Sequence, residues 1–362
     1  MLPDPTAAVT PLTCQDGHVD GSDPAASAQL SPRSHLRQQL KLTPVEETAA
    51  HVGLFRWRAS EAFLRLDGTP YFDGSYDKAL ANVCIPPAKQ VEVLCLGPRD
   101  VAAWMGIRTA EIDEQLLLAL KRSTAADSSS PDCSPSHPSP NCSPSPSHPR
   151  QVVIVGAGLD TRPWRLPLGG PGRCRVVELD SGAVERVKLA VLGAAGEGAG
   201  AVGEERGREE GGAEAAAGGR AAVLRLTQCE RVFAPVDLAQ REQVLSALSA
   251  SGHDPARPAV FLLEGLIGYL TPAQGAQLLS ALRCRAAPGS TLLMSAPPTQ
   301  EMREEAEARG RPLRHVTFEK AEETMARARA AGWVTRLLSA AELGIKYGVP
   351  SNRFGLIVGT AE

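Results

Sequence analysis

The sequence lacks an unbroken run of about 18 apolar residues, the length that a membrane-spanning helix requires. The longest candidate, around residues 259–270, is interrupted by Glu264. The first 34 residues also lack the apolar core of a secretory signal, and they contain four aspartates, whereas transit peptides are usually poor in acidic residues. We therefore expect a soluble, cytoplasmic protein with no membrane partner, although import into an organelle stays open.

Strong charge and paired cysteines are missing as well. The formal net charge of -3 indicates no polyanionic partner, so we expect neither nucleic acid nor an anionic membrane surface to bind. The eight cysteines form no CxxC pair and none has a histidine at zinc-binding spacing: Cys14, Cys84, Cys95, Cys133, Cys142, Cys174, Cys229 and Cys284. They predict free thiols in a reducing compartment and no metal site.

Three segments have no hydrophobic periodicity, and they divide the chain. One of them repeats SPSHP, and its closely spaced prolines exclude both helix and sheet. No metal is therefore expected to bind its Cys133, His137, Cys142 and His148. Between these segments, Thr43 and Thr109 are predicted to cap helices. The predicted organisation is a disordered leader (1–34), a helical cap (35–122), a Ser/Pro-rich insertion loop (123–150) and a sheet domain (151–362) containing a flexible Gly/Ala/Glu-rich loop (193–220).

The chain is organised around the stretch QVVIVGAGLDTRPWRL, residues 151–166. Its four apolar residues at 152–155 predict a strand buried on both faces of a parallel sheet. Gly156 and Gly158 then allow a sharp turn in which a ligand can lie against bare backbone at the start of a helix. Thr161 stands where dinucleotide-binding turns have a third glycine, which favours a smaller adenosyl cofactor over NAD.

An alternation of strands and helices follows. Seven strand regions joined by crossover helices predict an α/β fold with a doubly wound, mostly parallel sheet, whose ligands bind beyond the carboxyl ends of the strands. The expected regions are 152–155, 174–179, a strand pair within 221–236, 259–263, 290–295, 333–338 and 354–358.

Acidic residues follow four of these strands: Asp160, Asp180, Asp237 and Glu264. Each alone is more typical of a helix cap or a solvated loop. Four together on one rim, beside a glycine turn, suit a ligand that carries ribose hydroxyls, an exocyclic amine and a cationic centre. S-adenosylmethionine has all three.

Several of these stretches resemble one protein family. The segments GAGLDTRPWRL, ELD, APVDL and LLEGLIGYLTPAQ, together with RTAEID upstream, closely resemble the leucine carboxyl methyltransferase family and its bacterial O-methyltransferase relatives. The resemblance covers the chain from about residue 42 to its end, apart from the two loops. It implies a seven-stranded, Rossmann-like class I methyltransferase fold and an S-adenosylmethionine-dependent O-methyltransferase.

The resemblance also implies roles for individual residues. Arg108 would bind the cofactor's methionine carboxylate and Glu264 would lie near its ammonium group. Gly156 and Gly158 would lie beneath its methionyl and ribose portions, and Asp180 would bind the ribose. The remaining positions are Asp237 and Leu238, which would flank the adenine, and Tyr269, a candidate catalytic residue beside the cleft.

The resemblance does not define the methyl acceptor. The N-terminal cap helps to shape the acceptor pocket, and its segment YFDGSYDKAL only loosely matches the family's N-terminal signature. A small-molecule or protein carboxylate needs no general base, whereas a hydroxyl does, and Tyr269 and His315 are then the candidates. Two other interpretations stay open: an NAD(P)-dependent oxidoreductase, although its third glycine and its Tyr-x-x-x-Lys are absent, and a cofactor-binding protein without turnover. The sequence indicates no oligomeric state.

Overall fold

The computed structural model describes residues 36, 40, 42–96, 101–127, 149–193, 222–226, 228–309, 316–350 and 352–362. The predicted leader and most of both predicted loops lie outside these residues, and so does His315. None of the described helices is long and apolar enough to cross a membrane.

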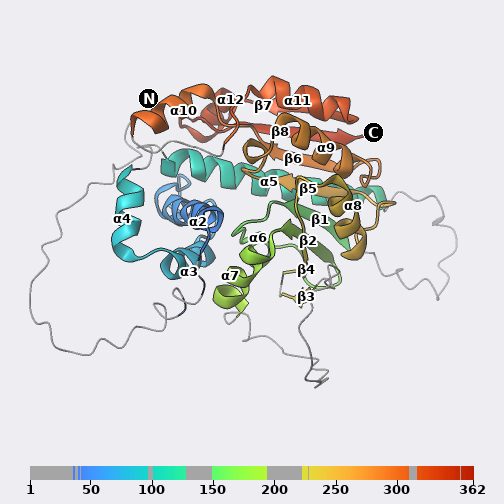
Figure 1. Ribbon diagram of the computed structural model, residues 1–362, viewed down its shortest axis with the longest axis horizontal. Coiled ribbons are helices and arrows are strands. Elements are labelled where there is room, and N and C mark those ends of the chain that lie inside the picture. Colours follow the sequence, from blue (N-terminus) through green and yellow to red (C-terminus); the bar gives the residue numbers. More distant parts are fainter. Residues whose placement is uncertain are drawn as a thin grey trace, which may run out of the picture.

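The described strands form one sheet in the order β3-β4-β2-β1-β5-β6-β8-β7 (Figure 1). Neighbouring strands from β4 to β6 are parallel, whereas β3 and β8 run antiparallel to their neighbours. The doubly wound, mostly parallel sheet is therefore confirmed, and the predicted strand pair is the hairpin of β3 and β4. The bounds are β1 Arg150–Val155, β2 Cys174–Asp180, β3 Ala222–Arg225, β4 Glu230–Pro235, β5 Ala259–Leu263, β6 Thr291–Ser295, β7 Trp333–Leu338 and β8 Leu356–Ala361.

The sheet separates two apolar cores, and β1 contributes to both. Val152 and Ile154 belong to the core on one face, and Val153 and Val155 belong to the core on the other. Side chains alternate across a strand, so a strand buried on both faces must be apolar at every position. This explains why the valine-rich run is continuous.

Helices cover both faces of the sheet (Figure 1). α8, α9 and α11 pack on the face of Val153, and α2, α3, α5 and α7 contribute to the core on the face of Val152. Thr43 and Thr271 form capping boxes at the starts of α2 and α9. The helices are α2 Pro44–Ala62, α3 Ser75–Cys84, α4 Pro87–Leu96, α5 Val101–Asp127, α6 Arg162–Arg165, α7 Gly182–Leu192, α8 Arg241–Ala250, α9 Pro272–Arg283, α10 Gln300–Ala308, α11 Ala321–Ala330 and α12 Ala340–Tyr347, with the 3-10 turn η2 at Ile267–Tyr269.

The long helix α5 differs from the expectation. It runs unbroken through Thr109, which is not a cap, and it continues beyond residue 123, where the loop was expected to begin. The hydroxyl of Thr109 donates to the carbonyl of Met105 at 2.9 Å, as a threonine inside a helix commonly does. Because α5 packs against β5 and β6, it can deliver a side chain to the carboxyl end of the sheet.

Candidate functional site

The glycine turn after β1 has the backbone geometry that its sequence predicts. Gly156 and Gly158 have φ values of 68° and 45°, in the left-handed region that favours glycine. A Cβ at Gly156 would lie 2.9 Å from Cδ1 of Leu266, so the turn also has no space for a side chain there. The bare backbone of this turn lies beside the carboxyl ends of β1 and β2, because the amide of Gly156 donates to the carbonyl of Leu179 at 2.8 Å.

Asp180 fixes one end of the site. One of its carboxylate oxygens accepts from the amide of Gly158 and the other from the amide of Ser181, both at 2.6 Å. Burial raises the pKa of Asp180 above its usual value even though these two donors favour the anion. The carboxylate is thus held rigidly at the turn, in a place where its charge is poorly solvated.

A hollow of about 540 Å³ adjoins Asp180 at the ends of β2 and β4. Asp237 and Leu238 line it as well, so three of the predicted cofactor-binding residues share one hollow. Its remaining lining residues are Ser181, Gly182, Pro235, Val236 and Gln243. Asp237 is exposed, and its Oδ1 accepts from the amide of Ala239 at 3.0 Å.

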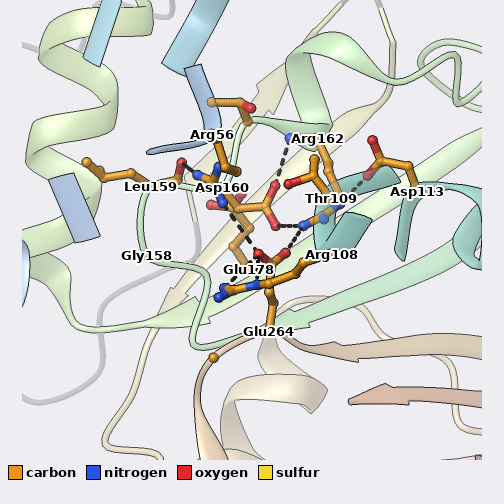
Figure 2. Close-up of polar contacts among 12 residues, drawn as sticks. Arg56, Arg108, Thr109, Asp113, Gly158, Leu159, Asp160, Arg162, Glu178 and Glu264 are labelled. Carbon is orange, nitrogen blue, oxygen red and sulfur yellow. Dashed lines mark hydrogen bonds and ion pairs between the residues drawn. The ribbon is translucent and has the colours of Figure 1, made fainter. Parts of the chain in front are cut away.

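Arg108 and Glu264 meet at the same edge of the sheet, beyond the carboxyl end of β5. Arg108 projects from α5, and Glu264 directly follows β5. Nε and Nη2 of Arg108 each lie 2.7 Å from Oε1 of Glu264 (Figure 2). Burial opposes ionisation of Glu264, but Arg108, Arg162 and Arg56 outweigh it and hold its pKa well below the usual range. Glu264 is therefore a permanent anion at neutral pH.

Glu264 belongs to a buried ion cluster of four arginines and four carboxylates. Arg162 donates to Oε2 of Glu264 at 2.6 Å, to Oδ1 of Asp113 at 2.7 Å and to Asp160. The cluster joins the sheet to α2, α3 and α5, and its formal charges cancel. Its members are Arg56, Arg108, Arg162, Arg165, Asp77, Asp113, Asp160 and Glu264.

The cluster corrects one expectation about the acidic rim. Asp160 does not face a ligand site, because both of its oxygens accept from Arg162, one from the backbone amide and one from the guanidinium. Thr161 is also engaged: its hydroxyl donates to Oδ2 of Asp77 at 3.0 Å. The residue in place of a third glycine thus connects the turn to α3.

Sequence reasoning missed most of the cluster, although the signal was partly present. Arg162 and Arg165 stand inside TRPWRL, and Asp113 stands inside RTAEID, so both quoted motifs contain residues of the cluster. Asp77 lies in the segment YFDGSYDKAL. Arg56 is in the middle of α2 with no motif around it, and only the structure reveals it.

Tyr269 has a less defined place. It closes η2 and is 46% exposed, and Arg108 is near enough to lower its pKa, although burial outweighs this effect and the pKa is raised overall. Among the residues that the structure describes, no group of three or more His, Cys, Asp or Glu side chains could hold a metal ion.

The central part of the chain is similar to known proteins. The leucine carboxyl methyltransferase family model matches residues 146–283. A Mycobacterium tuberculosis protein named as an S-adenosyl-L-methionine-dependent methyltransferase is 35% identical over 162 residues, which are 45% of this chain and 37% of that protein. A similarly named protein of Frankia alni is 38% identical over 144 residues, 40% of this chain and 39% of the relative.

The chain thus covers well under half the length of these relatives. A crystal structure of a protein of family DUF574 from Streptomyces avermitilis is 13% identical, with coverage of 79% of this chain and 95% of that one, at a TM-score of 0.47. Because this similarity is low, the fold is assigned from the chain's own strand order. The segment that resembles the leucine carboxyl methyltransferase family contains the glycine turn, Asp180, Asp237 and Glu264.

Proposed function

We propose that the chain is an S-adenosylmethionine-dependent methyltransferase that methylates an acceptor oxygen of a small molecule or a protein. The observation that carries the proposal is the Arg108–Glu264 ion pair at one end of the site, with Asp180 and its hollow at the other. An amino acid zwitterion can replace this ion pair without changing the net charge, because its carboxylate can bind Arg108 and its ammonium can bind Glu264. A nicotinamide dinucleotide has no such zwitterion.

The described residues fit the rest of the cofactor as well. The carboxylate of Asp180 would accept from both ribose hydroxyls, and the backbone of Gly156 and Gly158 would let the cofactor lie against the turn. Asp237 would accept from the adenine amino group, and Leu238 would pack on the ring. When bound, the cofactor would supply a methyl group on a positively charged sulfur. The acceptor oxygen would attack the methyl carbon in line with the carbon–sulfur bond, and the sulfur would leave as a neutral thioether.

The protein's main contribution to the rate would be alignment. Holding two reactants in line can supply up to about 7–11 kcal/mol of the barrier. The buried ion cluster serves this purpose because Arg162 fixes Oε2 of Glu264 and leaves Oε1 facing Arg108. The cofactor's ammonium group would therefore meet a carboxylate that Arg162 already holds in place.

A carboxylate acceptor agrees better with Tyr269 than a hydroxyl acceptor. A tyrosine phenol is protonated at neutral pH, and the partly buried position of Tyr269 raises its pKa further, so it is a poor general base. A carboxylate is already anionic and needs no base. The other candidate base, His315, lies outside the described residues.

The oxidoreductase alternative is not favoured. Thr161 directs its hydroxyl to Asp77 where a dinucleotide-binding turn would have a glycine. Cys174, Cys229 and Cys284 are free thiols, which supports the cytoplasm as the place of action.

Transfer of a labelled methyl group from S-adenosylmethionine to separate panels of carboxylates and alcohols tests the proposal. We expect transfer to a carboxylate by the wild-type chain and a large loss in Arg108→Ala. Transfer to alcohols alone would refute the choice of acceptor. Binding of the cofactor with no transfer to either panel would favour a cofactor-binding protein without turnover.

A further inference from the structure

Arg56 approaches the same oxygen of Glu264 that Arg108 holds, but it is kept at a greater distance. Nη1 of Arg56 lies 3.8 Å from Oε1 of Glu264, whereas two nitrogens of Arg108 lie 2.7 Å from that oxygen. The side chain of Arg56 is only 6% exposed, so it cannot turn toward solvent. A second buried cation therefore stands beside the group to which the cofactor's ammonium would bind.

Asp77 holds Arg56 in this position. Its Oδ1 accepts from Nε of Arg56 at 2.8 Å, while Nη2 of Arg56 donates to the carbonyl of Leu159 at 2.6 Å. The side chain of Asp77 is fully buried, and its second oxygen accepts from Thr161 at 3.0 Å. Asp77 is thus fixed on both sides and carries the nearest countercharge of Arg56 (Figure 2 shows Arg56 beside Leu159 and Glu264).

We propose that Asp77 is a positioning residue that keeps Arg56 away from Oε1 of Glu264 and so reserves this oxygen for the ammonium group of the cofactor. The inference rests on the proposed function, in which Arg108 moves to the cofactor's carboxylate. Once Arg108 leaves, Oε1 has two candidate cations, the incoming ammonium and Arg56. Opposite charges attract strongly at short distance in a poorly solvated site. Because Arg56 is already held by Asp77, the ammonium group is the cation that binds Oε1 of Glu264.

The variant Asp77→Asn tests this. It keeps the shape of the side chain and an acceptor for Arg56 but removes the countercharge, so Arg56 is expected to close on Glu264. Two ligands report the effect: S-adenosylhomocysteine, which has the amino acid zwitterion, and 5′-methylthioadenosine, which lacks it. We expect D77N to raise the dissociation constant of S-adenosylhomocysteine on the order of tenfold or more. The dissociation constant of 5′-methylthioadenosine is expected to change by no more than about threefold. A merely structural role would weaken both ligands equally.

Two further variants sharpen the test. Asp73→Asn is the matched control, because Asp73 is exposed just before the same helix and accepts from the backbone amide and the hydroxyl of Ser75. It is expected to bind both ligands as the wild type does. The double variant R56Q/D77N removes the competing cation, and we expect it to recover the preference for S-adenosylhomocysteine. A preference that stays lost in the double variant overturns the proposal.

The outcomes separate the inference from the proposed function. A wild-type chain that binds neither ligand contradicts both. A wild-type chain that prefers the zwitterion, with a D77N variant that prefers it equally, overturns only the role of Asp77. Should D77N not fold, Arg56→Gln decides: a preserved or greater preference supports competition by Arg56, and a reduced preference shows that Arg56 assists the ligand.

Discussion

Arg108 and Glu264 stand 156 positions apart in the sequence and meet in one ion pair, with two nitrogens of the arginine on a single carboxylate oxygen. Each is the group that the cofactor's amino acid end would bind. Within the described chain, the pair would therefore stand in for the ligand's two charges and keep a buried site neutral. A ligand must bring both charges to replace it, because a lone charge would leave one partner buried without a counterion.

Arg108→Ala should weaken cofactor binding selectively. The loss of a charge-assisted contact to the cofactor's carboxylate is expected to cost about 1.5–3 kcal/mol, or roughly tenfold to a hundredfold in dissociation constant. Calorimetric titration with S-adenosylmethionine measures it, with the exposed Arg303, which pairs with Glu307, changed to alanine as control. Equal affinity in the wild type and R108A would remove Arg108 from the site.

Asp180→Asn should weaken binding by about 1.5–3 kcal/mol and abolish a pH dependence. The pKa of Asp180 is raised by burial, and the ribose hydroxyls would bind the anion. Affinity is therefore complete above the pKa of the free protein and falls as the pH drops through it, starting at a higher pH than an ordinary aspartate would give. Dissociation constants measured from pH 4 to 8 check this; a D180N variant with the same pH profile would contradict it.

Gly156→Ala should destabilise the fold and impair binding together. Its φ of 68° strains any other residue, and the added Cβ would meet Leu266 at 2.9 Å, so a loss of about 1–3 kcal/mol in the free energy of unfolding is expected. Gly182→Ala is the control, since a Cβ there meets nothing within 4 Å at the start of α7. Urea denaturation of both variants measures the difference, and equal stability would show that the turn is not constrained.

Arg162→Gln should be among the most destabilising single changes in the cluster. It removes the cation between Asp113, Asp160 and Glu264, whose charges then remain buried, and a loss of about 3–5 kcal/mol is expected. The exposed Arg303–Glu307 ion pair is the comparison: R303Q should lower the free energy of unfolding by about 1 kcal/mol or less. A similarly small effect of R162Q on urea unfolding would show that the cluster does not support the fold.

Tyr269→Phe discriminates between the two kinds of acceptor. With a carboxylate acceptor, the rate of transfer is expected to stay within about tenfold of the wild type, because no proton has to be removed; loss of a general base costs roughly a hundredfold or more. Single-turnover transfer from labelled S-adenosylmethionine provides the measurement. A loss of a hundredfold with unchanged cofactor affinity would assign Tyr269 as a base.

The fold was largely predictable because its signals are local. Continuous valine-rich runs, capping threonines and glycine turns fix β1, α2 and α9 without knowledge of distant contacts. The error at α5 has the opposite cause: Thr109 is a good cap by type, but here its hydroxyl bonds back to Met105 inside a continuous helix that packing supports.

The positions of the candidate site residues were predictable where a residue ends or directly follows a strand, as Asp180 and Glu264 do, because the carboxyl ends of parallel strands share one edge. It was not predictable where the role depends on distant partners. Nothing in the sequence around Arg56 indicates that it will meet Asp77 and Leu159, and nothing local separates Asp160, which binds Arg162, from a ligand-facing aspartate.

Calorimetric titration of the wild-type chain with S-adenosylmethionine, in parallel with NAD, tests the central claim most directly. We predict saturable one-site binding of S-adenosylmethionine and no measurable binding of NAD. Absence of S-adenosylmethionine binding, or comparable binding of NAD, would contradict the account.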